Sequence, residues 1–182
     1  MSESWVVMPT RLPLVVRRCH GCAGERFRPD GKFRVNANHK LLDAWLLALC
    51  TACGATTKLG ILDRVPVRTV RPELLDRLHG NDPGLAAELL DDPGVARRNR
   101  IALDWDGAWR LGTGVPDRPE GEAVEVAVRF AARIPVRPVR LLAEGFGLSR
   151  AAAGRLIAEG SLVSAVRLGG RLSGDFTFTL KH

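Results

Sequence analysis

The chain has 182 residues, enough for one domain or two small ones, and its hydrophobic fraction of 46% is ordinary for a globular protein. No apolar run approaches the length of a membrane span, so the sequence predicts no transmembrane helix and no membrane partner. The net charge of +7 favours an anionic partner, while an aromatic fraction of 5% argues against a large stacking surface for single-stranded nucleic acid.

Charge is distributed unevenly, with basic segments on either side of an acidic middle. Residues 1–40 carry eight Lys/Arg and three Asp/Glu, residues 73–125 carry six and twelve, and residues 129–171 carry eight and two. Every basic residue of the last segment is arginine. Such a segment either contacts an anionic partner or forms a solvated face, and the counts alone leave both interpretations open.

The first predicted elements are extended, because residues 5–8 and 14–16 are β-prone, and they lead into a Cys-x-x-Cys pair. The chain has four cysteines in two such pairs, Cys19 with Cys22 and Cys50 with Cys53. The two-residue gap lets both sulfurs of one tight turn reach a single ion, and four thiolates form the preferred closed site of structural zinc. We therefore predict one structural Zn²⁺ in a zinc ribbon.

Disulfides and a redox-active dithiol are the alternatives to zinc. Nothing at the N-terminus resembles a signal peptide, so we expect a cytoplasmic, reducing compartment in which disulfides are rare. The Cys-His-Gly-Cys sequence resembles an oxidoreductase motif, but Pro29 and Gly31 break the helix that this motif requires. His20 is expected to face solvent. Because four sulfurs close a site to substrate, the metal is expected to hold structure and perform no chemistry.

The segment up to residue 70 is predicted to form a β-sheet. Residues 32–36 alternate basic and apolar side chains, which is the period of a half-buried strand. Residues 41–49 fit either a helix or a strand that is buried on both faces. We favour the strand, because a cysteine knuckle is usually entered from one. Residues 58–64 are predicted to continue the sheet after the second cysteine pair.

The middle of the chain is predicted to hold three short helices that begin near residues 72, 82 and 92. Each start combines a proline with a nearby acidic residue, which suits the first turn of a helix. Residues 101–105 and 109–111 flank Asp106-Gly107 and are predicted to form a hairpin. Residues 112–121 are rich in glycine, proline and charge and are the predicted linker.

The C-terminal part is predicted to combine two helices with short strands. Residues 139–144 form the first predicted helix, and Ser149 is a strong N-cap for the second, over residues 150–159. Strands are expected at residues 122–130, 161–163 and 176–180.

These elements predict an α+β fold in three parts. They are an N-terminal zinc-ribbon β-sheet (1–70), a short acidic helical segment with the linker (71–118) and a small C-terminal α/β domain (119–182).

The C-terminal part resembles the alpha-L RNA-binding motif, which is shared by a small-subunit ribosomal protein, pseudouridine synthases and tyrosyl-tRNA synthetases. The resemblance rests on an arginine that opens one helix, a Gly-Leu-Ser-Arg junction, and a second helix with Arg155-Leu156-Ile157 and a closing glycine. Val139 and Gly154 depart from the family pattern. The resemblance implies a fold of alpha-L type over residues 134–182, with helix starts that approach RNA phosphates. The nucleic-acid-binding residues predicted on this basis are Arg137, Arg140, Ser149, Arg150 and Arg155.

Over nearly its full length the chain is also similar to a bacterial family of conserved hypothetical proteins, the domain of unknown function ten sixty-two. The features that carry this similarity are Arg17-Arg18 before the first cysteine pair and the Leu-Asp-x-Trp-Leu run at residues 42–46 before the second. The resemblance implies no particular activity.

The sequence contains no recognisable catalytic constellation, because its four histidines are scattered and it has no Walker or dinucleotide loop. We therefore predict a non-enzymatic, zinc-stabilised nucleic-acid-binding protein whose favoured partner is structured RNA, such as ribosomal or transfer RNA. The alternatives are a DNA-binding transcriptional regulator with a helix-turn-helix, or a protein-interaction module. A strand after Gly160 would favour RNA binding, since helix-turn-helix domains more often continue into a further helix.

Overall fold

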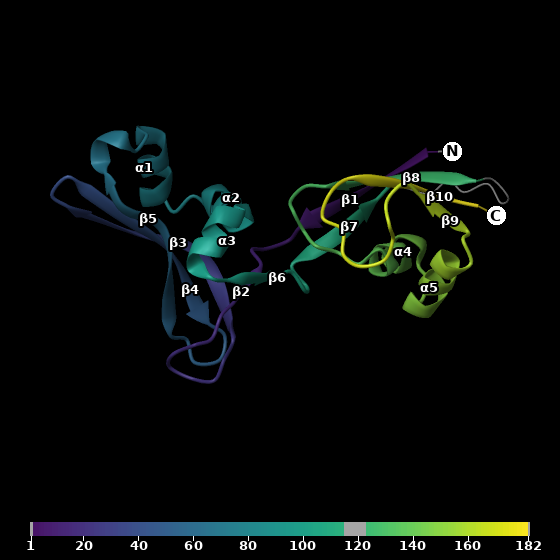
Figure 1. The fold of residues 1–182 in the computed structure, drawn as a ribbon, viewed down its shortest axis with the longest axis horizontal. Coiled ribbons are helices and arrows are strands. Elements are labelled where there is room, and N and C mark those ends of the chain that lie inside the picture. The colour runs from purple at the N-terminus through teal and green to yellow at the C-terminus, as the bar shows by residue number, and fades with distance from the viewer. Residues whose placement is uncertain (1, 115–122, 182) are drawn as a thin grey trace. The chain divides into compact units, whose positions relative to one another are not determined.

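The structure is a computed structural model that describes residues 2–114 and 123–181 (Figure 1). It divides into two compact units. Unit 1 combines the described residues up to Arg11 with those from Gly107 onward, and unit 2 is the continuous segment Leu12–Asp106. The described residues form two five-stranded sheets and five α-helices, which confirms the mixed α+β class. No helix in this part of the chain is long and apolar enough to cross a membrane.

Unit 2 is built on an antiparallel sheet with the strand order β5-β4-β3-β2-β6. The stretch that fitted either helix or strand is strand β4, paired on both sides, so that its backbone hydrogen bonds are made across the sheet. Its even-numbered residues from Leu42 to Cys50 are buried and its odd-numbered residues are not, as the two-residue period of a strand requires. The strands are β2 Leu14–Val16, β3 Arg26–Asn38, β4 Leu41–Cys50, β5 Thr56–Pro66 and β6 Ala102–Asp104.

Three short helices cover one face of this sheet, after the 3₁₀ turn η1 (Val67–Thr69): α1 Pro72–His79, α2 Pro83–Asp91 and α3 Pro93–Asn99. Each begins with proline, and Asp82 and Asp92 cap α2 and α3 by accepting backbone N–H groups. The predicted helix starts are therefore confirmed. The buried side chains of the helices share one core with those of the strands: Leu78, Leu85, Leu90 and Val95 with Val15, Phe27, Leu46 and Leu59.

Unit 1 has a sheet with the strand order β7-β1-β8-β10-β9, together with helices α4 (Pro138–Phe146) and α5 (Arg150–Ala158). The N-terminal strand β1 lies inside this sheet, antiparallel to β7 and parallel to β8. A strand from the start of the chain therefore belongs to the C-terminal unit. The strands are β1 Ser2–Pro9, β7 Trp109–Thr113, β8 Val124–Phe130, β9 Leu162–Ser164 and β10 Phe176–Leu180.

The indole ring of Trp5 is the centre of the core of unit 1. It is fully buried and makes edge-on contacts with Phe146, at a centroid separation of 4.9 Å, and with Phe178, at 5.5 Å. A Cβ atom at Gly145 would overlap this ring. Gly145 thus lies inside α4, where the absence of a side chain leaves room for the indole. The helix ends at Gly147, whose φ of +64° is left-handed.

The predicted hairpin over residues 101–111 is wrong. Strand β6 pairs with β2 in unit 2, whereas β7 pairs with β1 in unit 1, so the two strands belong to different sheets. The turn at Gly107, with a φ of +66°, is present, but each flanking strand finds a more distant partner. The chain passes between the units at residues 11–12 and 106–107.

The compact units also differ from the three predicted domains (1–70, 71–118 and 119–182). The helices of the predicted middle domain share the core of the unit 2 sheet, and β1 completes the sheet of unit 1. Within the predicted linker, residues 112 and 113 belong to β7, and residues 115–122 lie outside the described residues.

Candidate metal centre and arginine surface

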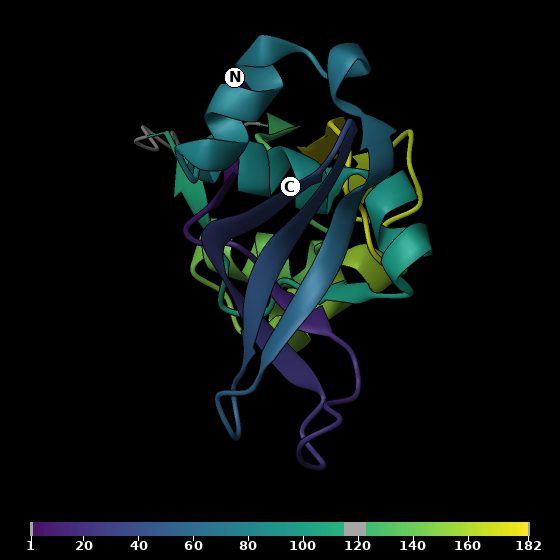
Figure 2. The same cartoon turned by 90° about the vertical axis from the view of Figure 1, so that its left-hand side faces the viewer.

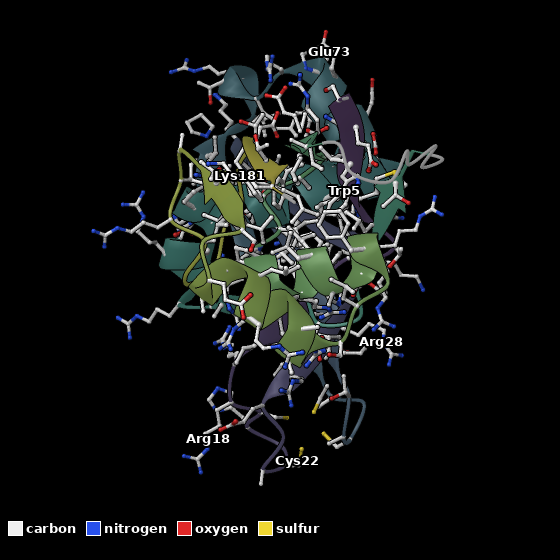
Figure 3. All side chains as sticks on the ribbon, turned by 90° about the vertical axis from the view of Figure 1, so that its right-hand side faces the viewer. Trp5, Arg18, Cys22, Arg28, Glu73 and Lys181 are labelled. Carbon is white, nitrogen blue, oxygen red and sulfur yellow. The ribbon has the colours of Figure 1, made fainter. Side chains whose placement is uncertain are left out.

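Two loops at one end of the unit 2 sheet bring the four cysteines together. Cys19 and Cys22 lie between β2 and β3, while Cys50 ends β4 and Cys53 lies in the turn that leads to β5. Phe27 pairs with Cys50 across the β3–β4 ladder, so strand register sets the two loops side by side. Figure 3 shows Cys22 on its loop at this end of the sheet.

The spacing of the sulfurs fits a tetrahedral metal site. All four Sγ atoms lie within 4.8 Å of one another. The Sγ–Sγ distance is 3.8 Å between Cys19 and Cys53 and 3.7 Å between Cys22 and Cys50. Four sulfurs about 2.3 Å from one zinc ion form a tetrahedron with edges of about 3.8 Å, whereas a disulfide bond is about 2.05 Å long. The cysteines are unbonded, so the arrangement fits a metal and not a pair of disulfides.

Backbone N–H groups point at the sulfurs. Gly21 donates to the Sγ of Cys19 at 3.4 Å, and Gly24 donates to the Sγ of Cys22 at 3.3 Å. The N–H groups of Cys53 and Ala52 donate to Cys50 and lower its pKa to about 6, because they stabilise the thiolate. Such donors orient metal ligands and hold them in their charged form.

The four thiols cannot all ionise without a cation between them. The Gly24 N–H lowers the pKa of Cys22, but its hydrogen bond with Cys53, burial, and its contacts with Cys50 and Cys19 together raise that pKa to about 12. Close thiolates repel one another, so one becomes acidic only while a neighbour keeps its proton. A divalent metal would remove this conflict, and the donor set therefore fits zinc in a four-sulfur site.

Gly24 is a site residue that the sequence analysis did not single out. A Cβ atom there would lie 3.2 Å from the Sγ atoms of both Cys22 and Cys50 and 3.1 Å from the Cβ of Ala52. A side chain at this position would crowd the sulfurs, and the signal in the sequence was only a glycine two residues after a cysteine. His20 is exposed, as predicted, and does not belong to the sulfur cluster.

The predicted nucleic-acid-binding residues divide into exposed and engaged side chains. Arg140 is engaged, because its Nε donates to Glu144 at 3.0 Å and its guanidinium lies 4.5 Å from the ring centroid of Trp109. Ser149 caps α5, as predicted, by accepting the N–H of Ala152 at 3.1 Å. Both side chains therefore have structural roles in the absence of any ligand.

The other three predicted residues are exposed arginines of the α4–α5 pair. Arg137 precedes the first residue of α4, Arg150 begins α5, and Arg155 lies in its last turn. None of the three has a carboxylate partner among the described residues. Their guanidinium groups therefore remain available to an anion. Arg155 is not at a helix start, which differs from the expectation that all the arginines gather there.

A pocket of about 410 Å³ beside the start of α4 adds one residue that the sequence analysis missed. Arg137 to Val139 form one side and residues 168–171 form the other, so that Arg171 and Arg137 both line it. The backbone groups of Val136 and Leu172 exchange two hydrogen bonds of 2.8 Å, which hold the two segments together. No local pattern could have indicated this pairing, because 36 positions separate the two residues.

The chain matches the family described as "Protein of unknown function (DUF1062)" over residues 35–168. This match covers more than half of the chain and reaches into both units, so the protein belongs to that family. No curated protein and no solved structure matches the chain.

Proposed function

We propose that the protein is a zinc-stabilised, non-catalytic RNA-binding protein, and that its partner is structured RNA of the ribosomal or transfer class. The observation that carries this proposal is the set of exposed, unpaired arginines on the α4–α5 pair, Arg137, Arg150 and Arg155. Arginine forks match phosphate oxygens and make the charge-assisted hydrogen bonds on which RNA backbones are held. The metal holds the loops of unit 2 and takes no part in a reaction.

The order of elements supports an alpha-L type of RNA-binding surface over a helix-turn-helix. After α5 the chain turns at Gly160, whose φ is +74°, and enters strand β9, which pairs with β10. A helix-turn-helix regulator would more often place a further helix there. Ser149 caps the start of α5, and both Ser149 and Arg150 at this helix start are exposed.

Titration of the full chain against a structured RNA hairpin, duplex DNA and a polyanion at several salt concentrations tests the proposal. Arg150→Ala should weaken RNA binding alike across hairpin sequences and reduce the salt slope by about one unit, because one phosphate contact is lost. Arg98→Ala is the matched control, since Arg98 is an exposed arginine in the last turn of α3 in the other unit. Its affinity for the hairpin should equal that of the wild type.

Each other outcome rejects the proposal in a different way. If Arg150→Ala weakened binding to one duplex DNA sequence far more than to others, the lost interaction would be a base contact, and the protein would be a DNA regulator. Equal wild-type affinity for the hairpin and the polyanion would leave only unspecific charge attraction. The absence of any binding at physiological salt would remove nucleic acid as a partner and favour a protein-interaction module.

A further inference from the structure

The sheet of unit 2 has a second face that its helices do not cover. In β4 the even-numbered side chains point toward the helices, so the odd-numbered ones point away from them. Strand register extends this uncovered face to both neighbours: Arg28 lies opposite Leu49, Arg34 opposite Trp45, and Lys58 opposite Leu47. We call these six residues the open face. In Figure 2 no helix lies in front of the central parts of β3, β4 and β5.

The open face surrounds a small apolar centre with cations. Leu49 is 39% exposed, and Trp45 is half-buried beneath Lys58, whose ammonium group lies 5.1 Å from the ring centroid. Arg28 and Arg34 are exposed and have no ion-pair partner among the described residues. The cations around this apolar centre have no carboxylate partner and therefore attract an anion.

Asp30 on β3 and Asp43 on β4 share this face, but neither forms an ion pair with Arg28, Arg34 or Lys58 among the described residues. Asp104 pairs with Arg26 at 3.0 Å, and Asp43 on β4 accepts the backbone N–H of Arg64 at 2.8 Å. The imbalance extends to the whole sheet region, because residues 12–70 carry ten Lys/Arg and four Asp/Glu. The helical segment 71–100, on the other side, carries five and six. The positive charge of unit 2 is therefore concentrated in its sheet and not in its helices.

The cations of the open face favour some binding partners for this uncovered sheet over others. A second copy of the chain would bring an equally cationic face against Arg28, Arg34 and Lys58, and contact between faces of like charge is unfavourable. An anion with flat, apolar groups fits instead, since it can pair with the arginines and stack on the indole. Single-stranded nucleic acid has this chemistry, with a phosphate and a base in every repeat.

We propose that the open face binds a single-stranded RNA segment, with phosphates on Arg28, Arg34 and Lys58 and one base stacked on Trp45. Lys58 is exposed and flexible, so its ammonium group can leave the indole for a phosphate when a base arrives. The proposal requires only the indole ring of Trp45, so it agrees with the low aromatic fraction, which argues against a large stacking surface. This site lies in unit 2 and does not depend on the α4–α5 arginines in unit 1.

Tryptophan fluorescence of the full chain tests the proposal. Trp5, Trp105 and Trp109 are at most 9% exposed, so quenching by an added strand reports on Trp45. The probes are a 12-nucleotide oligouridylate and a ribose-phosphate strand of equal length without bases. The wild type should bind the oligouridylate about 5- to 150-fold more tightly than the abasic strand, which is the range that stacking of one base supplies. Trp45→Leu should abolish this preference, and Trp45→Phe, which keeps a ring, should retain most of it.

Matched charge variants separate this site from the one in unit 1. Arg34→Ala should reduce the salt slope for oligouridylate by about 0.7, the value for one phosphate of a single strand. Arg68→Ala, an exposed arginine of η1, should leave it unchanged. Arg150→Ala should weaken binding of the RNA hairpin and not of oligouridylate, so the failure of one proposal is distinguishable from the failure of the other.

Four outcomes would overturn the proposal. They are equal affinity for the abasic strand, quenching that survives Trp45→Leu, the absence of binding, and equally tight binding of polyglutamate. The last would identify an acidic protein as the occupant. Metal content and circular dichroism of each variant show whether unit 2 is folded. If Trp45→Leu does not fold, Trp45→Phe still tests the proposal.

Discussion

The two units reach a folded state by different means. Unit 1 is assembled from two distant segments of the chain and is closed around a buried tryptophan that touches two phenylalanines. Unit 2 is one continuous segment with an apolar core beneath three short helices, and four cysteines lie at one end of its sheet. Two of these cysteines, Cys22 and Cys53, are not buried, so packing alone does not hold the loops that carry them.

This difference indicates where each unit is vulnerable. The core of unit 1 consists of close-packed rings, which tolerate no added atom but need no ligand. The cysteine loops of unit 2 have little regular structure of their own, and their close thiols repel when ionised, so we expect the order of these loops to depend on a bound cation. Loss of the metal should therefore act first on unit 2, and perturbation of the indole should act first on unit 1.

The largest expected effect is the loss of unit 2 when the metal is removed or when Cys50 is changed to serine. Structural zinc supplies about 10–16 kcal/mol in small zinc-binding peptides, which is comparable to the whole stability of a typical domain. Hydrogen exchange should show loss of protection in β3 and β4, while β1, β8 and β10 keep part of their protection. Purified, reduced wild type should carry one equivalent of zinc.

Thr51→Ala is the control for the cysteine variant, because Thr51 lies in the same knuckle but donates only to the carbonyl of Arg26. It should retain the metal and the protection of unit 2. A metal content below half an equivalent in fresh protein, or persistent protection of β4 after chelation, would contradict the assigned role of the sulfurs.

A smaller effect, confined to unit 1, is expected for Gly145→Ala. The new methyl group would overlap the Trp5 indole, and such overpacking destabilises a core by about 1–3 kcal/mol. Gly154→Ala is the opposite control, since no atom lies within 4 Å of a Cβ there and the residue is inside α5. It should stabilise unit 1 by about 0.5–1 kcal/mol. Thermal unfolding monitored by near-ultraviolet circular dichroism measures both, and equal effects of the two variants would refute the packing argument.

The smallest expected effect concerns Arg77, which links α1 to α2 by ion pairs of 2.7 Å with Asp82 and 2.9 Å with Glu88. Its hydrogen bonds lower the pKa of both carboxyl groups. The stabilisation is therefore complete above the unfolded pKa values, about 4, and is lost as pH falls through the lower folded values. The melting temperature of Arg77→Gln should lie below that of the wild type at pH 7, and the gap should close in acid. Acid release of metal is common to both proteins and cancels in the difference, so a gap that widens in acid would contradict this account.

The features that the sequence predicted correctly are those that depend on near neighbours. The prolines and aspartates that start α2 and α3, the Ser149 cap and the two cysteine pairs all act within a few residues. Strand β4 was the harder case, and its identity follows from pairing with β3 and β5 on both sides. The close approach of the four sulfurs was predictable because two Cys-x-x-Cys pairs, with no cysteine left over, match the ligand set of a four-sulfur metal site.

The features that the sequence did not reveal depend on distant partners. Nothing near residues 2–9 indicates that they lie between β7 and β8, and nothing near Arg140 indicates that its guanidinium stacks on Trp109. The helix predicted over residues 139–144 stops before Gly145, whereas α4 continues to Phe146 and the glycine makes room for the indole ring of Trp5, 140 positions earlier. Such contacts join residues that are far apart in the sequence, so local patterns carry no trace of them.

The interruption of unit 1 by unit 2 has a consequence for the order in which the chain acquires structure. Strand β1 is made first but must wait for β7 and β8, which follow after the 95 residues from Leu12 to Asp106. Closing a disordered loop of that length costs about 4 kcal/mol of chain entropy. A folded unit 2 brings its own ends together, since Leu14 pairs with Asp104, and so removes most of that cost. Zinc bound in one unit would thereby stabilise the other through chain entropy alone, without any contact between them.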